Sequence, residues 1–140
     1  MNMALSQIHP APAPRPAAAD RLKFDLRRYD SVSTILTVET HDDWSVAEIE
    51  IDTPHNGRAE FNAEFYSRMR PHYFWAIHRR AKHMIADAHL NGVRRVWTTI
   101  DAGDDFGHRW LRLLGFQPEG LMRGYTREGR DAVMYARVSR

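Results

Sequence analysis

Two glutamates, Glu60 and Glu64, stand at alternate positions of one short segment, with Asn62 between them. In an extended strand, residues two apart point to the same face, so both carboxylates would project from one side of a sheet. A carboxylate held in this way can act as a general base that removes a proton from a substrate. A strand with one face in water produces the same alternation, so the simpler interpretation of a solvated face stays open.

Other polar clusters carry weaker signals for a metal site. Asp101, Asp104 and Asp105 could offer oxygen ligands to a divalent cation, but they lack the spacing of a calcium loop. Capping of a helix by Asp104 or Asp105 is the alternative. Four histidines lie nearby in sequence: His72, His78, His83 and His89. They are five or six residues apart, whereas zinc-binding pairs on a helix are four apart, and we predict no metal site.

A basic and aromatic group lies just after the middle of the chain. It consists of Tyr73, Trp75, Arg79, Arg80 and Lys82. Such a mixture could contact phosphate groups or nucleic acid. The alternative is the solvated face of a helix, and a net charge of only +2 gives little electrostatic attraction to nucleic acid.

The first half of the domain is predicted to consist of strands. Residues 22–39 have a mixed pattern with the best strand at 32–38, and residues 44–51 form a second strand with a bulge between Val46 and Ile49. A turn at 55–57 leads to the clearest strand, in which Ala59, Phe61, Ala63 and Phe65 alternate with polar residues.

Two helices and two further strands are predicted to follow. Pro71 opens a helix over 71–90, whose apolar stripe leaves His78, Arg79, Lys82 and His83 largely outside it. A strand at 93–100 precedes a helix that Gly115 ends, so that Phe116 folds back onto Trp110, Leu113 and Leu114. A hairpin then pairs 121–126 with 132–138 through a turn at Glu128-Gly129. The pattern indicates an α/β fold with a mixed sheet.

Length and composition indicate one domain at 21–140 behind a proline- and alanine-rich arm at 1–20. The arm resembles an extended tether for protein partners. No apolar run is long enough to span a membrane, no secretory signal is evident and no cysteine is present. We expect a protein that is cytoplasmic during synthesis.

The segment from Asn91 to Val138, and its "LLGFQPEG" stretch above all, resembles the C-terminal half of the GCN5-related N-acetyltransferase superfamily. The similarity covers residues 44–138. It implies a mostly antiparallel mixed sheet flanked by helices, and residues 22–43 are too short for the helices that the family has there. The family transfers an acetyl group from acetyl-coenzyme A to an amine and often takes its base from the strand that holds Glu60 and Glu64.

The resemblance also shows where this chain departs from the family. The family's glycine-rich pyrophosphate loop corresponds to 70–77, where the chain has no glycine, and Pro71 removes one amide donor. The family's tyrosine acid corresponds to Leu111, its asparagine to Asp104 and its alanine to Gly107. Tyr125 or Tyr135 could substitute as the acid. If acetyl-coenzyme A binds, the resemblance assigns these residues to it: Arg70, His72, Trp75, Ala76 and Asp104.

The glycine-free helix opening and the "HRWLRLLGF" segment are similar to short acetyltransferase-like proteins of tailed bacteriophages and prophages, some of them virion components. Our leading hypothesis from sequence is therefore a catalytically degenerate acetyltransferase fold. It would serve as a structural or binding module in a phage particle, hold no cofactor, and carry a tryptophan in the former cofactor slot. The alternative is an acetyl-coenzyme A-dependent N-acetyltransferase with an altered loop and Glu60 or Glu64 as base. A nucleic-acid binder is a third, weaker hypothesis, and no membrane partner is expected.

Overall fold

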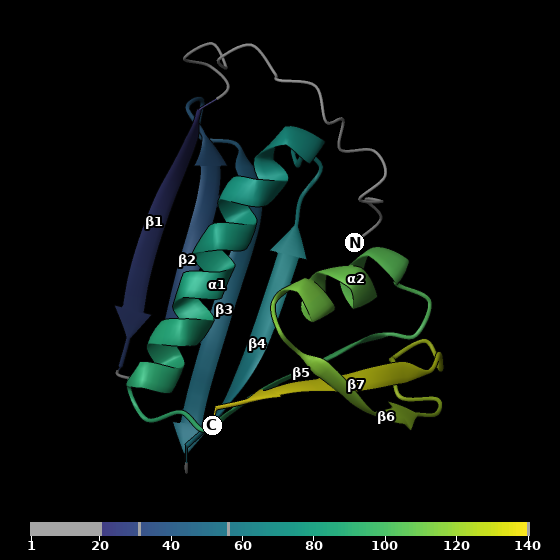
Figure 1. The fold of residues 1–140 in the computed structure, drawn as a ribbon. Helices are drawn as coiled ribbons and strands as arrows, with labels where there is room; N and C mark the ends of the chain where they lie inside the picture. The colour runs from purple at the N-terminus through teal and green to yellow at the C-terminus, as the bar shows by residue number, and fades with distance from the viewer. Residues whose placement is uncertain (1–20, 31, 56, 140) are drawn as a thin grey trace.

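The computed structural model describes residues 21–139 except 31 and 56, so the predicted arm at 1–20 lies outside the described residues. The described chain forms seven strands and two α-helices (Figure 1). In chain order these are β1 (Leu22–Tyr29), β2 (Ser33–Thr40), β3 (Ser45–His55), β4 (Arg58–Phe65), the 3-10 turn η3 (Pro71–Tyr73), α1 (Phe74–Leu90), β5 (Arg95–Asp101), α2 (Asp105–Leu113), β6 (Gln117–Met122) and β7 (Ala132–Val138).

All seven strands belong to one sheet in the order β1-β2-β3-β4-β5-β7-β6. Every neighbouring pair is antiparallel except β4 and β5, which run parallel and pair only from Arg58 to Glu60 on β4. Beyond that point the two strands diverge, so the sheet opens into a V (Figure 1). The prediction of a mixed, mostly antiparallel sheet is confirmed, and residues 22–40 form a hairpin rather than helices.

Helix α1 covers one face of the sheet, as its sequence predicts. Its apolar residues recur every three or four positions, and they are buried against the core: Phe74, Ile77, Ala81, Met84 and Ile85. Our placement of His78 outside this stripe is wrong, because its side chain is only 8% exposed. A buried imidazole is tolerated here because Trp110 supplies it with a hydrogen-bond partner.

Helix α2 lies on the same side of the sheet as α1 (Figure 1). Its N-terminus is capped by Asp104, whose Oδ1 accepts a hydrogen bond from Gly107 N at 2.8 Å. At its C-terminus Gly115 adopts φ +90°, Gly115 N donates to Arg112 O and Phe116 N donates to Leu111 O. These two bonds form the glycine-dependent stop that the sequence predicts.

Phe116 folds back into the core as expected, and its ring lies 5.6 Å from that of Phe61 on β4. Leu114 is buried, but Leu113 is 45% exposed and does not belong to this contact. The prediction for Leu113 is therefore wrong, because the helix turns that residue toward solvent.

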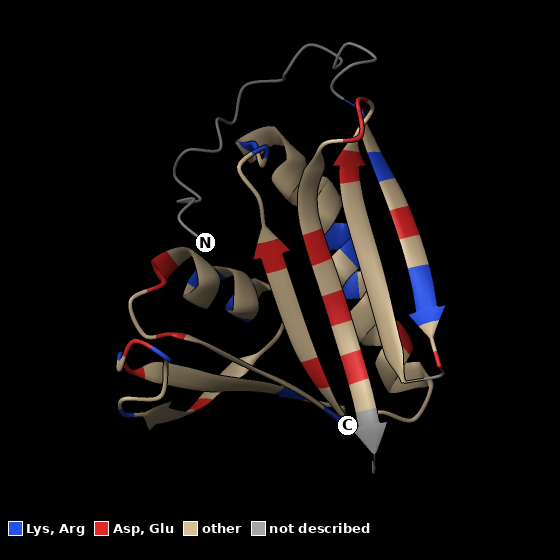
Figure 2. Ribbon diagram, turned by 180° about the vertical axis from the view of Figure 1, so that it is seen from behind, with Lys and Arg blue, Asp and Glu red and all other residues tan. Residues whose placement is uncertain are grey.

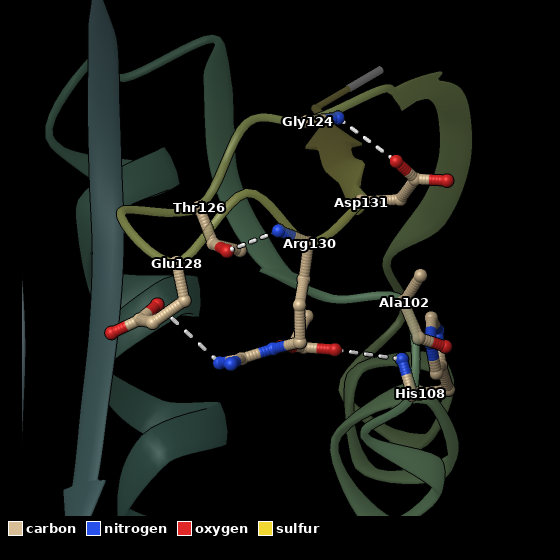
Figure 3. Close-up of polar contacts among 9 residues, drawn as sticks. Ala102, His108, Gly124, Thr126, Glu128, Arg130 and Asp131 are labelled. Atoms are coloured by element: carbon tan, nitrogen blue, oxygen red, sulfur yellow. Dashed lines mark hydrogen bonds and ion pairs between the residues drawn. The ribbon is translucent and has the colours of Figure 1, made fainter.

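Several predicted strand boundaries need correction. The sequence pattern missed β1 as a separate strand, and β6 spans Gln117–Met122 rather than 121–126. Residues 123–131 instead form a loop that side chains hold closed: Gly124 N donates to Asp131 Oδ1 and Arg130 N donates to Thr126 Oγ1 (Figure 3). Within that loop the turn predicted at Glu128-Gly129 is present, since Gly129 has φ +80° and its N–H donates to Thr126 O.

Three features predicted for the first strands are present in the structure. The bulge expected near Val46 appears where the register between β2 and β3 shifts, opposite Val38 and Glu39. Strand β4 has the predicted alternation, with Ala59 and Phe61 buried. Gly57 has φ +70° at the predicted turn, whose Asn56 lies outside the described residues.

The second face of the sheet carries no helix in the part of the chain that the structure describes (Figures 1 and 2). Ala47, Ile49 and Ile51 of β3 point toward the helices, so Glu48, Glu50 and Asp52 point to this open face. Figure 2 shows the acidic residues following β3 along that face. We call it the open face.

Candidate active site

A cavity of about 300 Å³ lies where β4 and β5 diverge. Its wall contains residues that point to the open face and residues that belong to the helix-covered side of the sheet. Its wall consists of Glu48, Glu50, Phe61, Asn62, Ala63, Glu64, Thr98, Thr99, Ile100, Gly107, Trp110 and Leu111. The cavity exists because the parallel pairing of β4 and β5 stops at Glu60, which leaves space between the remaining parts of the strands.

The open-face side of this cavity is acidic. Strand pairing sets Glu48 directly opposite Glu64 and Glu50 directly opposite Asn62. Like charges placed directly opposite each other destabilise a sheet, so an arrangement of this kind favours a cationic neighbour. None of the wall residues is a lysine, arginine or histidine.

Two hydroxyl groups orient these carboxylates. Ser33 Oγ donates to Glu50 Oε1 at 2.8 Å, and the Tyr66 hydroxyl donates to Glu64 Oε2 at 3.4 Å. Burial, followed by the charges of Glu64 and Glu48, raises the pKa of the Tyr66 phenol above its usual value. Tyr66 therefore stays a neutral donor to Glu64 at physiological pH.

The two glutamates predicted as bases differ in position. Glu64 lines the cavity, whereas Glu60 pairs with Asp52 and Trp97 at the closed end of the V and is not part of the wall. Glu48 and Glu50 were not predicted as site residues. Their spacing of two in β3 is the same signal that singled out Glu60 and Glu64, and it could have identified them.

On the helix side, α2 forms the wall with Gly107, Trp110 and Leu111. A Cβ atom at Gly107 would lie 2.6 Å from Asp104 Oδ2, so any side chain at that position would require the capping carboxylate to move. Leu111 is buried and offers no proton. Trp110 stands in the wall and leaves the cavity open.

The residues that the resemblance assigns to a cofactor gather near the start of α1, apart from Asp104. Arg70 turns its Nη1 back to the carbonyl oxygens of Ser67 and Met69. His72 and Trp75 are exposed, and Ala76 is half-buried. Asp104 caps α2 instead of facing this group.

The start of α1 offers few free amide groups to a phosphate. Pro71 has no N–H, Tyr73 N donates to Arg70 O, and Phe74 N donates to Pro71 O. The rings of Tyr73 and Phe74 are buried in the core. An anion at this helix end would therefore depend on side-chain cations more than on a backbone cradle.

Of the two tyrosines considered as acids, Tyr125 is 56% exposed and Tyr135 is buried. The Tyr135 hydroxyl lies 2.7 Å from His108 Nδ1. On the other side of the ring, His108 Nε2 lies 2.9 Å from Ala102 O, and Figure 3 shows these two residues side by side. The carbonyl can only accept, so in the neutral imidazole Nε2 carries the proton and Tyr135 donates to Nδ1. Neither tyrosine lines the cavity.

The acidic loop before α2 has partners within the chain. Asp101 accepts hydrogen bonds from Arg130 Nε and Gly103 N, and these bonds hold the pKa of its carboxyl below the usual value. Within residues 21–139, leaving out 31 and 56, no three histidine, aspartate or glutamate side chains converge as a metal site. The same part of the chain contains no helix with the length and apolarity needed to cross a membrane.

The sequence matches no protein-family model and no curated protein. The structure is similar to solved acetyltransferases. A ribosomal-protein-S5-alanine acetyltransferase from Vibrio fischeri has a TM-score of 0.65 and 14% identity over 77% of this chain, which spans 62% of that protein. A spermidine/spermine N-acetyltransferase from Vibrio cholerae, in complex with manganese ions, has a TM-score of 0.67 and 12% identity over 87% of this chain and 95% of its own.

A second structure of spermidine N-acetyltransferase from Vibrio cholerae, in complex with CoA and spermine, has a TM-score of 0.65 and 13% identity over 79% of this chain and 68% of its own. At identities this low the similarity concerns the fold. The seven-stranded sheet, its parallel β4–β5 pair and its two helices on one face therefore identify the architecture of this chain as the GCN5-related N-acetyltransferase fold.

Proposed function

We propose that this chain is an N-acyltransferase that transfers an acetyl group from acetyl-coenzyme A to a cationic amine in the cavity between β4 and β5. The observation that carries the proposal is the position of that cavity. It opens on one side among Glu48, Glu50 and Glu64, and it reaches α2 and β5 on the other. A cavity lined from both faces of the sheet suits a reaction in which two substrates approach from opposite sides.

The acidic side supplies what an amine acceptor needs. An alkylamine is an ammonium ion at neutral pH, so the carboxylates attract it, and it must lose a proton before it can attack a carbonyl carbon. Glu64 is in position to accept that proton, directly or through a water molecule. Tyr66 donates a hydrogen bond of 3.4 Å to Glu64 and favours the ionised carboxylate.

The chain's residues fit the thioester end of acetyl-coenzyme A better than its diphosphate end. Gly107, Thr98 and Thr99 leave a polar, uncrowded wall beside which a thioester can lie. The diphosphate would depend on the guanidinium groups of Arg70 and Arg79 and on the imidazole of His72 near the start of α1, with Trp75 and Ala76 beside them. When bound, acetyl-coenzyme A supplies the acetyl group and a thiol leaving group.

The cavity wall has no tyrosine to protonate the leaving thiolate, because Leu111 occupies the position where the family has one. A thiol has a pKa of roughly 8.5, so its thiolate can take a proton from water without enzymatic help. Loss of a positioned acid typically slows a reaction by a factor of about 10² to 10⁴. We therefore expect slow turnover.

The test uses Glu64→Gln with Glu60→Gln as its matched control, because both residues project from the same face of β4 and only Glu64 lines the cavity. Transfer of acetyl from acetyl-coenzyme A to spermidine is followed by mass spectrometry. E64Q should lower kcat/KM by about 10² or more, and E60Q should stay within a few-fold of the unmodified protein. Equal effects of the two substitutions, or no acetylated product from the unmodified chain, would contradict the proposal.

A non-catalytic structural or binding module, such as a virion component, is the second candidate. It is supported by the aromatic rings packed between the start of α1 and α2, where Phe74 lies 5.7 Å from Phe106 and 6.4 Å from Trp110. These rings, with Leu111 in place of an acid, suit a fold that no longer catalyses its reaction. Under this candidate acetyl-coenzyme A gives no binding heat, and the chain is recovered with assembled particles.

A further inference from the structure

Strand β1 forms one end of the sheet, and its outer edge pairs with no strand among the described residues. It is eight residues long, contains no proline or glycine, and pairs with β2 without a register shift. The opposite edge strand, β6, contains Pro118 and Gly120 and has a register shift between them. Proline and bulges protect an edge against pairing with another chain, so only the β1 edge lacks these protections.

We propose that β1 pairs with β1 of a second copy of this chain, antiparallel and about a two-fold axis at Leu26, to join the two sheets. The proposal is independent of the function proposed above. Leu26 is 51% exposed and Tyr29 is 46% exposed, although both belong to a regular strand. Pairing would cover part of this apolar surface and satisfy the edge amide and carbonyl groups.

The two-fold axis must lie midway between the two copies of one residue, so that this residue is opposite its own copy. Along an antiparallel strand, alternate residues direct their amide and carbonyl groups to opposite edges, so only residues of the same parity can lie opposite each other. An axis at Asp25 would set two aspartates face to face, and an axis at Arg27 would set two arginines face to face. Like charges in that arrangement destabilise the pair.

An axis at Leu26 avoids both conflicts. It sets Leu26 against Leu26, and it sets Asp25 opposite Arg27 of the second copy, twice by symmetry. An axis at Phe24 would also match charges near its centre, but it would set Arg27 against Arg21 and leave the end of β1 unpaired. Charged side chains on an edge usually discourage pairing, whereas here their order along the strand is self-complementary.

The residues needed for these contacts are available. Within one chain Arg27 Nε lies 2.9 Å from Asp25 Oδ2, and the two side chains are 66% and 55% exposed. An exposed ion pair of this kind contributes little to stability, so each partner can exchange it for the equivalent contact across the axis.

Charge reversal tests the register. R27D would bring two carboxylates together at each of the two symmetric charge pairs, and D25R would bring two guanidinium groups together there. Each reversal replaces two favourable pairs by repulsive ones and should raise the dissociation constant of the dimer roughly tenfold or more in sedimentation equilibrium. The double variant D25R/R27D restores both pairs in reversed order and should return the constant to within a few-fold of that of the unmodified chain.

R127D is the matched control, because Arg127 is exposed in the 123–131 loop and its reversal changes the net charge by the same amount. It should leave the dimer intact. A chain that stays monomeric at every concentration, a double variant as weakened as the single ones, or an equal loss in R127D would overturn the proposal. Hydrogen exchange gives a second readout: amides of β1 should be protected in the dimer and lose protection in R27D.

Discussion

The indole Nε1–H of Trp110 donates a hydrogen bond to His78 Nδ1 over 3.2 Å. The bond joins α2 to α1 beneath the candidate active site, and both side chains are buried. Because Trp110 can only donate, Nδ1 of His78 must be free of a proton. The hydrogen bond between the two helices therefore depends on a neutral imidazole.

Stability should decrease as the pH falls below about 6.5. Burial, followed by the positive charges of Lys82 and Arg79, lowers the pKa of His78 in the folded chain. The unfolded chain therefore takes up the proton first, so the free energy of unfolding declines from about pH 6.5 down to the folded-state pKa. Urea unfolding across this pH range measures the decline.

Replacing His78 with asparagine tests this explanation. The Oδ1 atom of asparagine can accept the Trp110 hydrogen bond, and asparagine does not titrate. H78N should flatten the pH dependence of unfolding relative to the unmodified chain. H83N is the matched control, since His83 is exposed on the same helix. If H83N flattens the profile as much as H78N does, the buried histidine is not its source.

Gly107 and Asp104 should show coupled effects on stability. Alanine is the better helix former by up to about 1 kcal/mol, but its Cβ would lie 2.6 Å from Asp104 Oδ2. G107A should therefore destabilise the chain or leave it unchanged, whereas G107A placed in a D104A chain should stabilise it. Urea unfolding of the four variants measures this cycle, and equal effects of G107A in both backgrounds would refute the clash.

Tyr135 should contribute to stability and not to catalysis. Its hydroxyl donates to His108 and does not line the cavity, so Y135F removes a hydrogen bond without changing the site. The expected loss is about 1 kcal/mol of unfolding free energy, with acetyl transfer within a few-fold of normal. Exposed Tyr125→Phe is the control for stability, and a large drop in kcat for Y135F would make Tyr135 the missing acid.

Amine affinity should depend on ionic strength. The carboxylates Glu48, Glu50 and Glu64 attract a cationic acceptor through partly solvated charges, which salt screens. KM for spermidine should rise as sodium chloride is added, and kcat should change little. A KM that is independent of salt would argue against the acidic wall as the acceptor site.

Local sequence patterns predicted the elements whose signals are contained in a few neighbouring residues. The alternation around Phe61 identified β4, the stripe of α1 and the proline at its start located that helix, and Gly115 marked the end of α2. Each of these signals arises from the chain's own geometry over one or two turns or a single strand.

The errors concern contacts between distant segments. The buried position of His78 depends on Trp110, 32 residues later, and no periodicity within α1 reveals it. Strand β1 is an edge strand with charges on both faces, so its alternation is weak. The boundaries of β6 depend on Asp131 and Thr126 closing the following loop, an arrangement of side chains that strand propensity does not encode.

The candidate site could be predicted only in part. Glu64 was proposed as a base because it alternates with apolar residues in one strand, and the structure places it in the cavity wall. The cavity itself results from the divergence of β4 and β5, which is a property of their short parallel pairing. Likewise, Trp110 is part of the cavity wall because α2 holds it against Phe61 and Phe65, a contact between distant segments that no local pattern reveals.

Calorimetric titration of the unmodified chain with acetyl-coenzyme A tests the central claim most directly. An acyltransferase site between β4 and β5 predicts saturable heat with a dissociation constant in the micromolar range. Titration without heat at millimolar ligand would contradict the claim, and the fold would then serve binding without acyl transfer.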